Sequence, residues 1–182
     1  MADSVDRWRT IASEEMADCR VFRVRRDDKQ RVSDHADRAG QPHSFYVIDS
    51  PDWVNVVAIT TGGDVVLARQ YRQGVERITL EVPGGLVDPG EEALQAAKRE
   101  LLEETGYASD TWIHLGTTAP NPAIQSNRLD TYLALEATAI RPPEFDSTEH
   151  ITLKLVSFSE SLAMISSGAI DHALVIVALH RA

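Results

Sequence analysis

The chain has 182 residues, 43% of them hydrophobic, and a formal net charge of −10 with a pI near 5.0. This composition supports a folded apolar core and excludes a disordered chain, and the absence of a Lys/Arg cluster argues against a nucleic-acid partner. A single cysteine, Cys19, excludes an internal disulfide, and neither a secretory signal nor an apolar run long enough for a bilayer is present, so we expect a cytoplasmic protein without a membrane partner.

The first part of the chain is predicted to form strands. Residues 19–25 alternate in polarity, and the charged stretch from Arg25 to His43 is interpreted as a hairpin connection or exposed loop. Further strands are predicted at residues 44–49, 53–60 and 64–71, the last two joined by Thr61-Gly62-Gly63-Asp64, which is typical of a hairpin turn.

The second part mixes helices and strands. A short extended piece at 78–82 ends at Pro83-Gly84-Gly85, and residues 91–105 follow a helical pattern that stops at Gly106. Strands are predicted at 112–118, 129–135 and 151–158, and two helices at 159–165 and 170–180. Hairpin-linked strands around one central helix predict an α+β fold.

Three carboxylates share one edge of the central helix. Glu100, Glu103 and Glu104 are spaced i, i+3 and i+4, so their side chains point from the same face, while Leu94, Ala97 and Leu101 form an apolar face. Like charges at this spacing destabilise a helix unless a cation compensates them. Because hard divalent ions prefer oxygen ligands and share them with substrate phosphates, the pattern predicts a magnesium site. A Glu-rich solvated surface helix is the alternative that the three residues alone leave open.

The wider pattern removes that alternative. From Gly85 to Tyr107 the sequence resembles the Nudix box, which is the signature of the Nudix hydrolase superfamily, at every position: Gly85, Glu91, Arg99, Glu100, Leu101, Glu103, Glu104, Gly106 and Tyr107. The resemblance implies an α/β/α sandwich around a mixed sheet with a central catalytic helix. It also implies two parts, an N-terminal strand extension at residues 1–50 that builds a homodimer and a Nudix hydrolase domain at residues 51–182.

The resemblance implies a role for each matched residue. Glu100 and Glu104 match metal ligands, Glu103 matches the third carboxylate of the cluster, and the carbonyl of Gly84 matches a backbone ligand. The expected cofactor is Mg²⁺, with Mn²⁺ as the alternative. Glu103 and Glu104 are also the expected catalytic residues of the box, whereas structural support is expected from Gly85, Glu91, Arg99 and Gly106.

The flanks of the box are similar to those of ADP-ribose and nucleoside-diphosphate-sugar pyrophosphatases. Gln70-Tyr71-Arg72 and the segment from Leu80 to Gly85 carry this similarity upstream, and Pro122 carries it downstream, although Asn121 and Ala123 depart from the subgroup's usual neighbours. The similarity implies that Arg72, Glu81 and Pro122 bind substrate. Glu149 matches an acidic loop residue that binds metal or activates water, and Glu144 and Asp146 are its rivals.

These features lead to three functional hypotheses. The first is metal-dependent hydrolysis of the pyrophosphate bond of a nucleoside diphosphate linked to a sugar, such as ADP-ribose, giving a nucleoside monophosphate and a sugar phosphate. The second is a house-cleaning hydrolase of nucleoside triphosphates or dinucleoside polyphosphates. The third is a non-catalytic sensor that binds ADP-ribose, against which the intact box argues.

Overall fold

The computed structural model describes residues 5–32, 40–145 and 150–182, and its chain divides into two compact units. The first unit comprises Met1–Pro51 and Ala119–Asn127, and the second comprises Asp52–Thr118 and Arg128–Ala182. The second unit therefore contains the whole segment that resembles the Nudix box.

The first unit is built on an antiparallel sheet in the order β1 (Arg7–Asp18), β2 (Arg23–Val32) and β3 (His43–Asp49). The interpretation of residues 25–43 as a connection or loop is wrong for its first part, because β2 continues to Val32. A strand of such charged composition is stable here because β1 and β3 pair with it on both sides and its own charges pair with one another.

Asp27 is the centre of these charge pairs and is fully buried. It accepts hydrogen bonds from Ser13 at 2.7 Å and Arg25 at 2.6 Å, and Lys29 lies 3.4 Å away. Burial by itself would raise the pKa of Asp27, but these three partners outweigh it and hold the pKa below its ordinary value. The carboxylate therefore stays charged inside the sheet.

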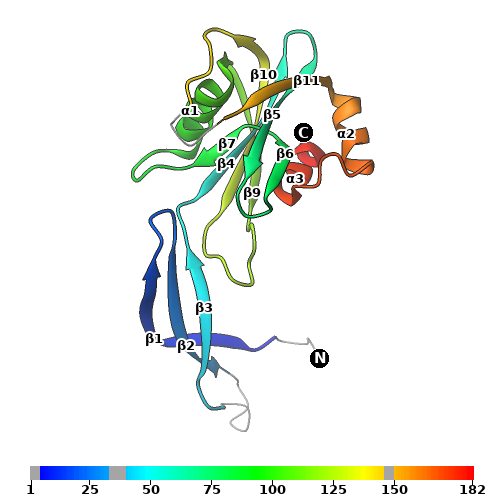
Figure 1. The fold of residues 1–182 in the computed structure, drawn as a ribbon. Helices are drawn as coiled ribbons and strands as arrows, with labels where there is room; N and C mark the ends of the chain where they lie inside the picture. The colour runs from blue at the N-terminus through cyan, green and yellow to red at the C-terminus, as the bar shows by residue number, and fades with distance from the viewer. Residues whose placement is uncertain (1–4, 33–39, 146–149) are drawn as a thin grey trace. The chain divides into compact units, whose positions relative to one another are not determined.

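The second unit is a mixed eight-stranded sheet with helices on both faces (Figure 1). Its main path is β11-β5-β4-β10-β8, while β6 pairs with β5, β7 with β4 and β9 with β10. β4 and β10 are parallel and the other pairs are antiparallel. The strands are β4 (Trp53–Thr60), β5 (Asp64–Arg72), β6 (Arg77–Glu81), β7 (Gly84–Leu86), β8 (Tyr107–Ala108), β9 (Thr111–Thr118), β10 (Leu129–Ala139) and β11 (Thr152–Ser157), and the helices are α1 (Ala93–Thr105), α2 (Phe158–Ser166) and α3 (Ala173–Arg181).

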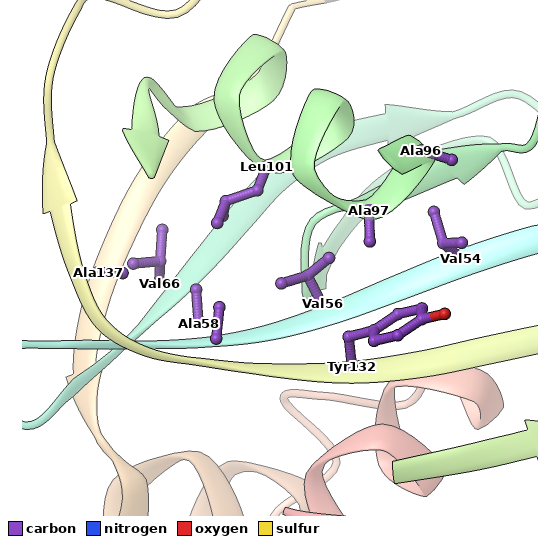
Figure 2. Close-up of a cluster of buried hydrophobic side chains, with 10 residues drawn as sticks. Val54, Val56, Ala58, Val66, Ala96, Ala97, Leu101, Tyr132 and Ala137 are labelled. Carbon is purple, nitrogen blue, oxygen red and sulfur yellow. The ribbon is translucent and has the colours of Figure 1, made fainter. Parts of the chain in front are cut away.

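The sheet separates two apolar cores. Side chains of a strand alternate between faces, so Val56 packs toward α1 whereas its neighbour Val57 packs toward α2 and α3. Figure 2 shows Ala97 and Leu101 of α1 directed at the sheet, where Val56 and Val66 meet them. The predicted α+β fold, an α/β/α sandwich around a mixed sheet, is confirmed.

Helix α1 ends where the sequence predicts. Gly106 adopts a φ of 75°, in the left-handed region, and its N–H donates to the carbonyl of Leu102. A Cβ at this position would lie 1.9 Å from the carbonyl oxygen of Arg141, so the turn also needs glycine for space. Among the helices of the described chain, none is long and apolar enough to cross a membrane.

Candidate active site

The three carboxylates of α1 lie at the junction of the helix with β7. Burial of Ala97 and Leu101 fixes the rotation of α1 about its axis. This rotation sets the direction of the three carboxylates, which together form the acidic edge of α1. Glu104 is buried, with 5% of its surface exposed, while the side chains of Glu100 and Glu103 are 14% and 42% exposed. Solvent exposure therefore increases from Glu104 through Glu100 to Glu103.

The Gly84-Gly85 backbone closes one side of this cluster. The Gly84 N–H donates to Oε2 of Glu104 at 3.0 Å, and a Cβ on Gly85 would lie only 2.3 Å from Oε1 of Glu100. β7 cannot retreat, because it pairs with β4 and a Cβ on Gly84 would lie 2.2 Å from the carbonyl oxygen of Val54. Two consecutive glycines therefore let the chain pass between β4 and the acidic edge of α1.

Arg99 ties the acidic edge to the loop before the helix. It donates twice to Glu91, at 2.9 and 3.1 Å, and also to Glu100 at 2.8 Å and Glu103 at 3.3 Å. A fifth bond of 3.0 Å reaches the carbonyl oxygen of Leu86 at the end of β7. Hydrogen bonds to Glu91, opposed by partial burial and supported by Glu100, raise the pKa of Arg99, and the same pairing lowers the pKa of Glu91. The guanidinium holds α1, β7 and the loop in one arrangement.

The donor set fits a hard divalent cation. Arg99 donates to Glu91, Glu100 and Glu103, and Glu104 accepts from the Gly84 N–H. One guanidinium thus faces four carboxylates, and the cluster keeps an excess of negative charge and of carboxylate oxygens. Within the described ranges no three His, Cys, Asp or Glu side chains are gathered closely enough to form a ready ligand set. Arg99 and the Gly84 amide draw the carboxylates toward themselves, so metal binding would require local rearrangement of side chains.

A second polar group lies on the paired strands β5 and β6. Arg72 makes a two-point contact with Glu81 at 2.8 and 2.7 Å, and Thr79 donates to the same carboxylate at 2.5 Å. Burial by itself would raise the pKa of Glu81, yet Arg72, Thr79 and the nearby His172 together hold the pKa below its ordinary value. Glu81 is almost inaccessible, whereas 44% of the Arg72 side chain is exposed. Glu81 therefore holds Arg72 in place, and the positively charged guanidinium of Arg72 remains accessible to solvent.

Of the other predicted site residues, the structure describes Pro122 and Glu144. Pro122 belongs to the segment Ala119–Asn127 of the first unit. The N–H of Glu144 donates to the carbonyl of Glu103 at 2.8 Å, and its exposed carboxylate pairs with Arg141. Glu149 and Asp146 lie outside the described residues.

Two polar residues next to this site were not predicted. Thr79 stands two positions before Glu81, so the strand period places both on one face, and this spacing was the available signal. Asn55 pairs in register with Gly84, and its side-chain amide donates to the carbonyl of Leu174 in α3 at 3.3 Å. The register of β4 against β7 places Asn55 beside Gly84, and no local sequence pattern predicts this position.

Known proteins resemble this chain over most of its length. ADP-ribose pyrophosphatase of Bacillus subtilis is 26% identical over 160 residues, covering 87% of this chain and 83% of that protein. The methanol dehydrogenase activator of Bacillus methanolicus is 27% identical over 172 residues, covering 94% of this chain and 90% of that protein. The crystal structure of an ADP compounds hydrolase shares the fold, with a TM-score of 0.82 at 23% identity over 99% of this chain and 94% of that one.

The family assignment follows from the extent of the match. The NUDIX domain matches residues 51–176, which include β4, the Gly84-Gly85 backbone and the whole of α1. The chain belongs to the NUDIX family and is a Nudix pyrophosphohydrolase.

Proposed function

We propose that the protein hydrolyses the pyrophosphate bond of a nucleoside diphosphate linked to a sugar, with ADP-ribose as the first candidate, in a reaction that depends on Mg²⁺. Water and ADP-ribose would give AMP and ribose 5-phosphate. The observation that carries the proposal is the acidic edge of α1, where Glu100 and Glu104 lie against the Gly84-Gly85 backbone. The similarity to an ADP-ribose pyrophosphatase over most of the chain supports this choice of substrate.

The chain's own residues have distinct tasks in this proposal. Glu100, Glu103, Glu104 and the Gly84 carbonyl would hold the cation. When bound, Mg²⁺ would neutralise the pyrophosphate charge and polarise its oxygens. Arg99 would keep the acidic edge in place through Glu91, and its two hydrogen bonds to that carboxylate support this role.

Arg72 is the proposed phosphate contact. Its guanidinium is fixed in orientation by the two bonds to the buried Glu81, and an oriented planar fork suits a phosphate better than a mobile one. Replacement by glutamine should raise KM for ADP-ribose more than it lowers kcat. Lys98→Gln provides a control with the same change of charge on the exposed side of α1.

The substrate is tested by comparing rates on ADP-ribose, another nucleoside-diphosphate sugar, a dinucleoside polyphosphate and a nucleoside triphosphate, each with Mg²⁺, with Mn²⁺ and with a chelator. A phosphatase coupled to the reaction reports phosphate monoesters, and chromatography identifies the products. The proposal predicts preference for a diphosphate sugar and no turnover in chelator. Preference for the triphosphate or the dinucleoside would favour the house-cleaning alternative, and binding without turnover would favour the sensor.

The proposal includes a homodimer joined through the first unit. In the described residues of that unit the only buried ones, Asp27 and Asn127, are polar, so the unit has no apolar core of its own. Every residue of β1 is exposed, and large apolar side chains such as Trp8, Ile11 and Tyr46 face solvent. A three-stranded sheet with uncovered apolar side chains needs a partner surface, and a second copy supplies one.

The dimer is tested by measuring molar mass in solution by light scattering. The chain of 20.1 kDa should elute at about twice that mass, and Ile11→Glu with Tyr46→Glu should shift the equilibrium toward the monomer. A monomer at all concentrations would contradict this part of the proposal.

The cytoplasmic location stays a prediction, with which the exposed, unpaired Cys19 agrees.

A further inference from the structure

A cavity of about 330 Å³ lies on the face of the sheet that is turned away from α1. Leu80 belongs both to its lining and to the core shared with α2 and α3. Thr79 also borders the cavity, but its hydroxyl donates to Glu81 on the other face of β6. The cavity is lined by Arg69, Ile78, Thr79, Leu80, Lys154, Met164 and Ala169. It is therefore a different place from the acidic edge of α1.

The lining carries two cationic side chains and no acidic one. Leu67 of β5 pairs with Lys154 and Arg69 pairs with Thr152 in an antiparallel ladder, so Arg69 and Lys154 are diagonal neighbours on one face. Diagonal neighbours have Cα atoms about 7–8 Å apart, which two long side chains can span to meet at a single ligand. The sheet register itself thus brings the two cations to one cavity.

The nearby acidic residue does little to neutralise these charges. Lys154 lies 3.7 Å from Glu160, whose side chain is 53% exposed, and such a solvated pair is weak. In the part of the chain that the structure describes, no carboxylate forms an ion pair with Arg69. In a chain of net charge −10, a cavity with two cations and no lining acid is a local exception to the surrounding charge.

We propose that this cavity binds a phosphate monoester that carries an apolar or partly apolar body. A doubly charged phosphate matches the two cations, because the arginine fork can contact two of its oxygens while the lysine acts as a point charge. Ile78, Leu80 and Met164 offer apolar contacts for the rest of the molecule. The volume lies within the range of small-ligand sites, about 300–1,000 Å³.

Met164 provides a direct probe. The chain contains three methionines, Met1, Met16 and Met164, and Met164 lines the cavity. Full-length protein labelled with ¹³C at the methionine methyl groups is titrated in chelator with AMP, ribose 5-phosphate and inorganic phosphate, and Met164→Leu assigns the signal. The methyl signal of Met164 should shift and saturate with a monoester, and more tightly than with inorganic phosphate.

Charge-removing variants decide where the ligand binds. Arg69→Gln and Lys154→Gln should each weaken binding roughly tenfold or more, while Lys98→Gln, on the exposed side of α1, should leave it unchanged. Circular dichroism and urea unfolding that match the wild type would show that the variants are folded. No saturable shift of Met164, equal binding of inorganic phosphate and the monoesters, or unchanged affinity in both cavity variants would overturn the proposal.

Discussion

Replacing Gly85 by alanine tests the arrangement of β7 and α1 at one atom. The new Cβ would lie 2.3, 2.4 and 2.7 Å from Oε1, Cδ and Oε2 of Glu100. A relaxed carbon–oxygen contact is about 3.4 Å, so the carboxylate must move by about 1 Å. Displacement of a catalytic group by about 1 Å costs on the order of 10²-fold in rate. We expect kcat/KM for the best substrate to fall by about that factor and Mg²⁺ to bind more weakly.

Stability should change much less than activity. Gly85 does not have a positive φ, and the obstructing atoms belong to the end of a flexible side chain, so we expect a loss of less than about 1.5 kcal/mol in urea unfolding. Gly63→Ala is the control. Its φ of 86° makes alanine strained by about 1–2 kcal/mol, but nothing lies within 4 Å of the added Cβ and activity should persist. A folded Gly85→Ala enzyme with kcat/KM within threefold of the wild type would refute the reasoning.

Three further perturbations test other contacts. Arg99→Lys keeps the charge but loses the two-point contact with Glu91, so the free energy of unfolding in urea should fall by about 1–2 kcal/mol. Glu91→Gln should then lower the free energy of unfolding clearly less in the Arg99→Lys protein than in the wild type. Gly106→Ala should destabilise by more than about 2 kcal/mol, and by more than Gly63→Ala, because its Cβ also meets the Arg141 carbonyl; equal losses would contradict this. Because the folded pKa of Glu81 lies below its ordinary value, its ionised form stabilises the fold above the ordinary pKa, and this contribution is lost as the pH falls through the lowered pKa. The stability difference between the wild type and Glu81→Gln, measured by urea unfolding, should therefore shrink as the pH falls below the ordinary pKa of a glutamate. A constant difference would show that the charge of Glu81 contributes nothing.

Local patterns were sufficient to predict α1 and its end. The helical period set the buried positions Ala97 and Leu101, and Gly106 marked the stop because only glycine adopts its φ without strain. The hairpin at Gly62-Gly63 was equally local and joins β4 to β5 as predicted. Such features depend on residues within a few positions of each other, so the sequence contains the information directly.

Features that depend on pairing between distant strands were not predictable. β2 is a strand because β1 and β3 pair with it, although its charged residues alone suggest a loop. The position of Asn55 beside Gly84 follows from the register of β4 against β7, and the meeting of Arg69 with Lys154 follows from that of β5 against β11. A shift of one residue in either register would turn these side chains to the opposite face.

The most direct test of the central claim is the initial rate of AMP formation from ADP-ribose by the wild type and by Glu104→Gln, measured across a Mg²⁺ titration. Glu104 is buried and accepts the Gly84 N–H, and glutamine preserves its size while removing its charge. The account predicts that wild-type turnover requires Mg²⁺ and that the variant, folded by circular dichroism, loses at least about 10²-fold in kcat. A variant with full activity and an unchanged Mg²⁺ dependence would contradict the assignment of the acidic edge of α1 as the metal site.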